Sequence, residues 1–136
     1  MKKILAAVIF MIIMAAGAAS AAPEYKIKVA YISSESHPTA QAMTGFAKDV
    51  DSASKGRIKV ELYPNGQLGS DRELCEGVQM GTIQMAIPST SALAGFDKRI
   101  QVHDLPYLFT TRKAAFDAVD GELGQKLNSY LAKKGF

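Results

Sequence analysis

Residues 57–87 have the sequence RIKVELYPNGQLGSDRELCEGVQMGTIQMAI, and this stretch decides the fold. Apolar and polar residues alternate over 58–62, which is the pattern of a strand with one buried face. Pro64-Asn65-Gly66 ends that strand, because proline donates no hydrogen bond and Asn-Gly readily adopts positive φ. The alternation resumes over 83–87. The stretch therefore predicts a strand, a helix and a strand, and so short a crossover favours a right-handed parallel pair.

The helix of this unit is predicted to begin after Ser70, because Glu73 stands at the spacing of a capping box. Leu74 and Val78 supply its apolar face. Gly81 stands where the end of a helix favours a residue in the left-handed conformation. The helix is therefore expected to end just before the second strand.

The segment before this unit predicts one more strand and one more helix. Residues 25–32, YKIKVAYI, become apolar on both faces toward their end, which is typical of a strand buried on both sides. Apolar residues recur at helical spacing from Ala40, and Ser54-Lys55-Gly56 ends that pattern. Thr39 or Ser36 is expected to cap this helix. An alternation of strands and helices is the order of an α/β protein.

The segment after residue 87 is predicted to be mostly helical. Asp104 is expected to hold an apolar connector in place, and the rings of Tyr107 and Phe109 are expected in the core. The predicted elements are a short helix within 92–96, a charged surface segment over 97–101, a partly extended connector over 102–109, a helix capped by Thr110 or Thr111 that ends at 120–121, and a helix over 123–134.

Residues 1–21 have the three parts of a secretory signal peptide. Two lysines form the basic region, residues 4–14 form the apolar core, and Ala19-Ser20-Ala21 forms the small-residue cleavage site. The apolar core is shorter than the roughly 20 residues that a membrane span needs. We therefore expect cleavage after Ala21 and a periplasmic location, rather than a retained anchor.

Composition argues against several classes of function. The 136 residues carry a formal charge of +3, and removing residues 1–21 leaves 115 residues with a charge of +1. A nucleic-acid-binding surface is not expected at that charge. Cys75 has no partner for an intramolecular disulfide and is expected to be a small buried hydrophobe. His37 and His103 lack the spacing of metal ligands, so neither a metal nor another cofactor is expected.

Two polar loops form the predicted binding region. In an open parallel sheet, ligands bind outside the carboxyl ends of the strands, where the strand order reverses. Hydroxyls and free amides at helix N-termini can hold a carboxylate there, which suits capture of a small organic anion. A single serine in such a loop is more often an ordinary turn or cap residue, whereas the position of the two loops favours binding. The candidate binding residues are Ser33, Ser36, His37, Ser89, Thr90 and Ser91.

His37 has two interpretations of equal weight. It stands before Pro38 in a polar loop, so it is either a ligand contact or a residue that caps the turn.

Four blocks stand in register along the chain: FAKDV at 46–50, YPNGQLG at 63–69 with GRI at 56–58 before it, GTIQM at 81–85, and DLPYLF at 104–109. Together they resemble the DctP-type solute-binding proteins of tripartite ATP-independent periplasmic (TRAP) transporters, over nearly the whole chain after residue 21. The resemblance implies an α/β fold, a periplasmic-binding-protein-like lobe of type II with a mainly parallel sheet flanked by helices and the first strand in its centre.

The resemblance also implies a function and a set of partners. It implies a monomeric, two-lobed protein that is not an enzyme and that closes on a carboxylate-bearing solute. The solute is then delivered to the small and large membrane subunits of a permease driven by an ion gradient.

The extent of the chain follows from the same resemblance. Residues 22–136 correspond to the N-terminal part of lobe I, and we expect the rest of lobe I and lobe II to be absent. The chain ends at Phe136 directly after a predicted helix, whereas such a unit normally continues into a strand. Family members clamp the carboxylate with an arginine. Its sequence context is matched by none of Arg57, Arg72, Arg99 and Arg112.

Two alternative functions stay open at this point. A binding protein of another transporter class has the same fold, and physics allows the same turn at residues 63–69 in either class. A secreted α/β enzyme would need a nucleophile with a base, or a pair of carboxylates. The sequence contains no G-x-S-x-G elbow, no Walker loop and no G-x-G-x-x-G motif, which disfavours the enzyme.

Overall fold

Three parallel strands form one sheet in the order β2-β1-β3. The computed structural model describes residues 22–136, so the predicted signal peptide lies outside the described residues. The strands are β1 (Tyr25–Tyr31), β2 (Ile58–Tyr63) and β3 (Met85–Ile87). β1 pairs with β2 along six residue pairs and with β3 along three. β2 and β3 are parallel, as predicted, but they are not neighbours, because β1 lies between them.

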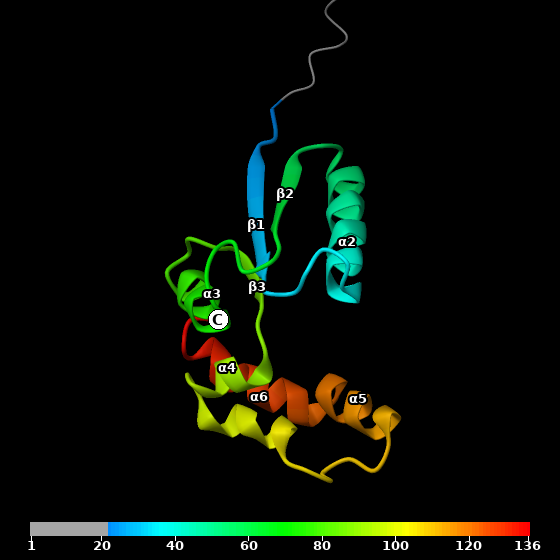
Figure 1. The fold of residues 1–136 in the computed structure, drawn as a ribbon, viewed down its shortest axis with the longest axis vertical. Coiled ribbons are helices and arrows are strands. Elements are labelled where there is room, and N and C mark those ends of the chain that lie inside the picture. The colour runs from blue at the N-terminus through cyan, green and yellow to red at the C-terminus, as the bar shows by residue number, and fades with distance from the viewer. Residues whose placement is uncertain (1–21) are drawn as a thin grey trace, which may run out of the picture.

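One helix covers each face of the sheet, α2 (Pro38–Ser54) on one side and α3 (Asp71–Gln79) on the other (Figure 1). Successive side chains of a strand point to opposite faces, and β1 uses both. Val29 and Tyr31 pack toward Ala40 of α2, whereas Ala30 packs against Leu74 of α3. Burial on both faces is therefore confirmed for the second half of β1, while Tyr25 at its start is 55% exposed.

The local signals of the β2 to β3 segment act as predicted. Ser70 is the N-cap of α3 and forms a capping box with Glu73, whose carboxylate accepts from the Ser70 amide at 2.8 Å. Gly81 has a φ of 75° directly after the helix. β3 covers 85–87 instead of the predicted 83–87, because the side-chain oxygen of Gln84 accepts a hydrogen bond from the Lys28 amide at 3.1 Å, next to the hydrogen bonds between β1 and β3. The local sequence thus predicts these elements, and the Gln84 side chain shortens β3 because it replaces a backbone acceptor for the Lys28 amide.

The N-cap of α2 differs from the prediction. His37, rather than Thr39 or Ser36, occupies this position, and its Nδ1 accepts a hydrogen bond from the Thr39 amide at 3.2 Å. The end of the helix is as predicted, with Lys55 at φ 56° and Gly56 at φ 78°. The loop after β1 therefore passes directly into the helix through the histidine.

Four short helices form a layer beyond the carboxyl ends of the strands (Figure 1). Ala94, Ile100 and Leu127 form the core of this layer, with exposed fractions of 3–5%. The predicted charged surface at 97–101 is confirmed for Lys98, Arg99 and Gln101, which are exposed, and is wrong for Asp97 and Ile100, which are buried. The helices are α4 (Thr90–Ala94), the 3-10 helix η2 (Lys98–Asp104), α5 (Arg112–Asp120) and α6 (Glu122–Ala132).

The connector over 102–109 also differs from its prediction. Val102 to Asp104 belong to η2 instead of an extended segment. The Tyr107 side chain is 97% exposed, and its backbone has a φ of 59°, so the predicted core position of this ring is wrong. Thr111 caps α5 as predicted, accepting from the Ala114 amide at 3.1 Å. Within residues 22–136, no helix has the length and hydrophobicity to cross a membrane.

Candidate functional site

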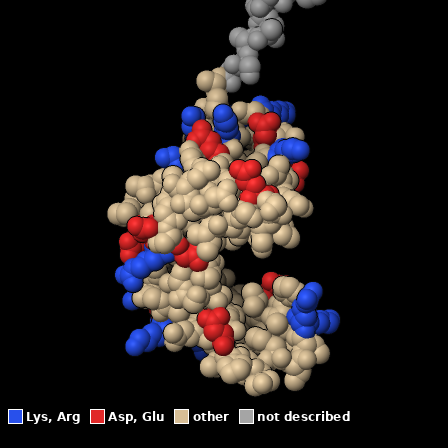
Figure 2. Space-filling model, in the orientation of Figure 1, with Lys and Arg blue, Asp and Glu red and all other residues tan. Residues whose placement is uncertain are grey.

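The strand order places a crevice at the carboxyl end of the sheet. The chain passes from β1 to β2 on one side of β1 and then returns to β3 on the other side. Such a reversal of direction is where open α/β sheets bind ligands. The loops after β1 and β3 flank this point. The space-filling view shows a deep notch between the part of the molecule that contains the sheet and α2 and the helical layer that contains α5 (Figure 2). The two predicted loops therefore lie at the expected edge of the sheet.

The loop after β1 is tied to the loop after β2. The carbonyls of Ser33 and Tyr31 accept hydrogen bonds from the amides of Asn65 and Gly66 at 3.0 and 3.1 Å. Asn65 and Gly66 have φ values of 56° and 65°, as their sequence predicted. Within the loop after β1, the hydroxyls of Ser34 and Ser36 lie 3.1 Å apart. Ser36 is exposed and Ser33 is half-buried.

His37 acts as the cap of α2, so that interpretation is confirmed. Nδ1 accepts the Thr39 amide and also lies 3.0 Å from the Thr39 hydroxyl. With Nδ1 as acceptor, the proton of the neutral ring is on Nε2. The exposed ring can therefore present an N–H donor while it caps the helix.

The loop after β3 is tied to two carboxylates. Ser89 donates to Asp71 Oδ2 twice, from its amide at 3.0 Å and from its hydroxyl at 2.8 Å. The hydroxyls of Ser89 and Ser91 lie 3.0 Å apart. Thr90 donates to Asp104 Oδ1 at 2.7 Å, which gives Asp104 the structural role expected of it. The hydroxyl protons of Ser89 and Thr90 thus point to protein carboxylates.

Asp71 contacts the candidate loop after β3, and sequence reasoning missed this contact. It is the first residue of α3, and an acid in the first turn of a helix is ordinarily explained by the helix dipole alone. Its contact with Ser89 spans 18 residues of sequence, so no local pattern announces it. Its position directly after the capping residue, where the loop that follows β2 passes into α3, is the signal that was available.

The six candidate residues form two groups in the structure. Ser89, Thr90 and Ser91 gather beside Asp71 and Asp104, at the start of α4. The other three follow β1, and that loop bonds to the segment after β2. Both groups therefore border the same edge of the sheet, each supported by a different neighbour.

The hollow nearest to the β1 loop does not have the chemistry of an anion site. Its volume is about 410 Å³, and its lining includes Tyr31, Glu35 and Gln67. Burial, followed by the charge of Glu35, raises the pKa of the Tyr31 hydroxyl. A carboxylate such as Glu35 repels an anionic ligand, so this hollow is a poor candidate for the site that binds the carboxylate of the solute.

Cys75 and the acidic residues do not form a reactive centre. The thiol is 1% exposed, and burial, followed by the charges of Asp71 and Glu76, raises its pKa. A thiol of that kind is a poor nucleophile. Nowhere in residues 22–136 do three His, Cys, Asp or Glu side chains gather in a way that could hold a metal ion.

Residues 29–136 match the family model described as bacterial extracellular solute-binding protein, family 7, or DctP. The chain belongs to this family. The C4-dicarboxylate-binding protein DctB of Bacillus subtilis is 39% identical to this family 7 chain over 106 residues, which are 78% of the chain and 30% of the relative. The C4-dicarboxylate-binding periplasmic protein DctP of Rhodobacter capsulatus is 33% identical over 110 residues, 80% of the chain and 33% of the relative.

Solved family 7 structures have the same fold. A TRAP periplasmic solute-binding protein from Sulfurospirillum deleyianum with bound succinate has a TM-score of 0.79 and 34% identity, over 84% of this chain and 37% of that one. The sugar acid binding protein DctPAm from Advenella mimigardefordensis with galactonate has a TM-score of 0.80 and 33% identity, over 85% and 37%. The chain thus spans about a third of the length of these relatives.

These matches confirm three predictions. The resemblance to DctP-type proteins of TRAP transporters is confirmed, and so is the α/β fold with a parallel sheet flanked by helices. Family 7 consists of solute-binding proteins, which confirms the prediction that the chain is not an enzyme. The other transporter class considered above is therefore not needed to explain the sequence.

Proposed function

We propose that this chain is part of an extracytoplasmic solute-binding protein of a TRAP transporter. The protein captures a small carboxylate-bearing solute and delivers it to the small and large membrane subunits of the permease. The observation that carries the proposal is the reversal of strand order at β1, which sets two hydroxyl-bearing loops beside one crevice. Relatives that bind succinate, galactonate and C4-dicarboxylates support the solute class.

The extent and location of the protein are part of the proposal. Residues 22–136 form the N-terminal part of lobe I of a two-lobed monomer, which is supported by the share of about a third that the chain covers in its relatives. Exposed apolar side chains such as Leu105 and Phe116 support it as well, because further parts of a lobe would cover them. Residues 1–21 direct the protein to the periplasm, where the Rhodobacter capsulatus relative is described.

Binding of a carboxylate can be tested by thermal shift on the full protein. A ligand at a hundredfold excess over its Kd stabilises the folded state by about 2.7 kcal/mol, which raises the melting temperature by several degrees. We expect this rise with C4-dicarboxylates or sugar acids and none with the matching amides or alcohols. Melting that is insensitive to every acid would refute the proposal.

The loop after β1 offers a matched pair of variants for the same assay. Ser36→Ala removes an exposed hydroxyl of the candidate set, and Ser129→Ala removes a hydroxyl on α6 that bonds to the Lys126 carbonyl. We expect the first variant to weaken the ligand-dependent shift and the second to leave it unchanged. Equal shifts in both variants would remove Ser36 from the site.

A further inference from the structure

Asp71 joins the start of α3 to the start of α4. Its Oδ2 accepts both the amide and the hydroxyl of Ser89. Its Oδ1 is buried, and among residues 22–136 no donor lies within hydrogen-bonding distance of it. A carboxylate only accepts hydrogen bonds, so the proton of the Ser89 hydroxyl is committed to Asp71. A half-buried carboxylate whose buried oxygen has no partner depends on the bonds that its other oxygen receives.

The neighbouring hydroxyls follow the same direction. Ser91 Oγ lies 3.0 Å from Ser89 Oγ, and because the Ser89 proton goes to Asp71, Ser91 is the donor of this pair. Thr90 donates to Asp104 at 2.7 Å. Hydroxyls that donate in a chain toward a carboxylate become better acceptors, since each bond polarises the next. The hydroxyl protons of the loop are therefore held by acceptors of the protein, which leaves oxygen lone pairs of the exposed serines to accept hydrogen bonds from a solute.

We propose that loop 89–91 binds hydroxyl groups of the solute rather than its carboxylate, and that Asp71 is the positioning residue that sets this preference. The inference rests on the proposed function and narrows its solute class. A solute hydroxyl donates to the exposed oxygens of Ser89 and Ser91. A solute carboxylate meets lone pairs there and is repelled by the charges of Asp71 and Asp104, which bond to Ser89 and Thr90. The favoured solutes are hydroxylated carboxylates, such as hydroxy acids and sugar acids.

Titration calorimetry on the full protein tests the preference with succinate, malate and tartrate. These acids share one carbon skeleton and carry no, one and two hydroxyl groups. One good hydrogen bond changes affinity by up to about tenfold, so we expect malate or tartrate to bind about tenfold more tightly than succinate. Gluconate is included as a longer hydroxylated acid, in case the site is larger than these solutes.

Variants of Asp71 test its role in the preference. Asp71→Ala releases the Ser89 proton for donation to a carboxylate, so we expect the hydroxylated acids to lose their advantage over succinate. Asp71→Asn retains the shape of the side chain and an acceptor oxygen, and we expect a smaller loss. Asp49→Ala, an exposed acid on α2, is the matched control and retains the preference. Circular dichroism checks that each variant is folded.

The possible outcomes separate the inference from the proposed function. If succinate binds as tightly as the hydroxylated acids, or if the Asp71 variants retain the preference, the role of loop 89–91 is refuted and carboxylate capture stands. If none of the four acids binds, the proposed function fails and the inference fails with it. If the Asp71 variants do not fold, the affinities of the wild-type protein for the four acids still test the preference for hydroxylated acids over succinate.

Discussion

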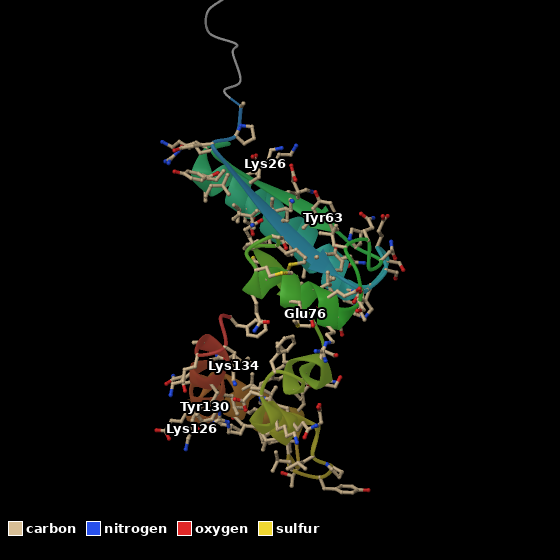
Figure 3. All side chains as sticks on the ribbon, turned by 90° about the vertical axis from the view of Figure 1, so that its left-hand side faces the viewer. Lys26, Tyr63, Glu76, Lys126, Tyr130 and Lys134 are labelled. Carbon is tan, nitrogen blue, oxygen red and sulfur yellow. The ribbon has the colours of Figure 1, made fainter. Side chains whose placement is uncertain are left out.

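Asp97 is a buried carboxylate at the start of η2, and its neutralisation depends on one arginine. The residue is 8% exposed. Its carboxylate oxygens accept hydrogen bonds from the backbone amide and the guanidinium of Arg99. The same guanidinium lies 3.4 Å from the centre of the Tyr130 ring. Figure 3 shows Tyr130 on α6, between Lys126 and Lys134. The hydrogen bonds from the Arg99 side chain and amide lower the pKa of Asp97 to about 2.

We expect this pair to make stability depend on pH in the acid range. A lowered pKa means that the unfolded chain takes up a proton before the folded one does. The contribution of Asp97 is therefore present above its ordinary pKa of 3.8 and is lost as the pH falls through about 2. Denaturant unfolding of wild type and Asp97→Asn should show a stability difference that narrows as the pH falls through this window.

Asp117→Asn is the control for the acid titration. Asp117 forms an exposed pair with Lys113 on α5, and exposed pairs contribute little to stability. This variant should remain close to wild type at every pH. A constant difference between Asp97→Asn and wild type from neutral to acid pH would show that Asp97 titrates alike in the folded and unfolded states.

At the scale of elements, α2 allows the two roles of His37 to be separated. Asparagine is a good N-cap and alanine is a poor one, so His37→Ala should cost about 1 kcal/mol of stability, whereas His37→Asn should retain the cap and the stability. Urea unfolding measures both. If the Nε2–H of His37 contacts the solute, both variants lose affinity for the solute. If His37 only caps the helix, the His37→Asn variant retains the affinity of the wild type.

The junction of α5 and α6 allows a second test by paired glycine variants. A Cβ on Gly124 would overlap the Val119 carbonyl oxygen, whereas a Cβ on Gly45, inside α2, would meet nothing within 4 Å. Gly124→Ala should therefore destabilise the protein by about 1–3 kcal/mol or more, because the backbone has to shift. Gly45→Ala should stabilise it by up to about 1 kcal/mol. A Gly124→Ala variant with wild-type stability would contradict the close packing of these helices.

The elements that could be predicted are those whose signals are local. The capping box at Ser70 and the left-handed Gly81 are read from a few neighbouring residues, and both are found in the structure. The two helices after residue 110 were predicted from local caps and periodicity, whereas the burial of Ile100 was not, because Ile100 packs against Leu127 of α6 and a charged local sequence does not indicate that contact. Asp71 was missed for the same reason, since Ser89 reaches it only in the folded sheet.

At the scale of the whole molecule, the buried core of residues 22–136 is divided into three small clusters. One lies between the sheet and α2, one between the sheet and α3, and one within the helical layer. β3 contributes only three residues to the sheet, and its outer edge pairs with no strand among residues 22–136. A short sheet with open edges and divided cores gains little free energy from burial.

The proposed place of residues 22–136 within a lobe predicts how this segment behaves alone. Several apolar side chains near the connector and α5 are exposed, among them Leu105 (55%), Tyr107 (97%) and Phe116 (60%). Purified residues 22–136 should therefore bind a hydrophobic dye under native conditions and unfold over a broad temperature range. Tyr107→Asn should reduce dye binding without loss of stability, because asparagine tolerates the φ of 59° and little packing is lost. A sharp cooperative transition without dye binding would show that the segment is an autonomous domain, and would refute its proposed place as a part of lobe I.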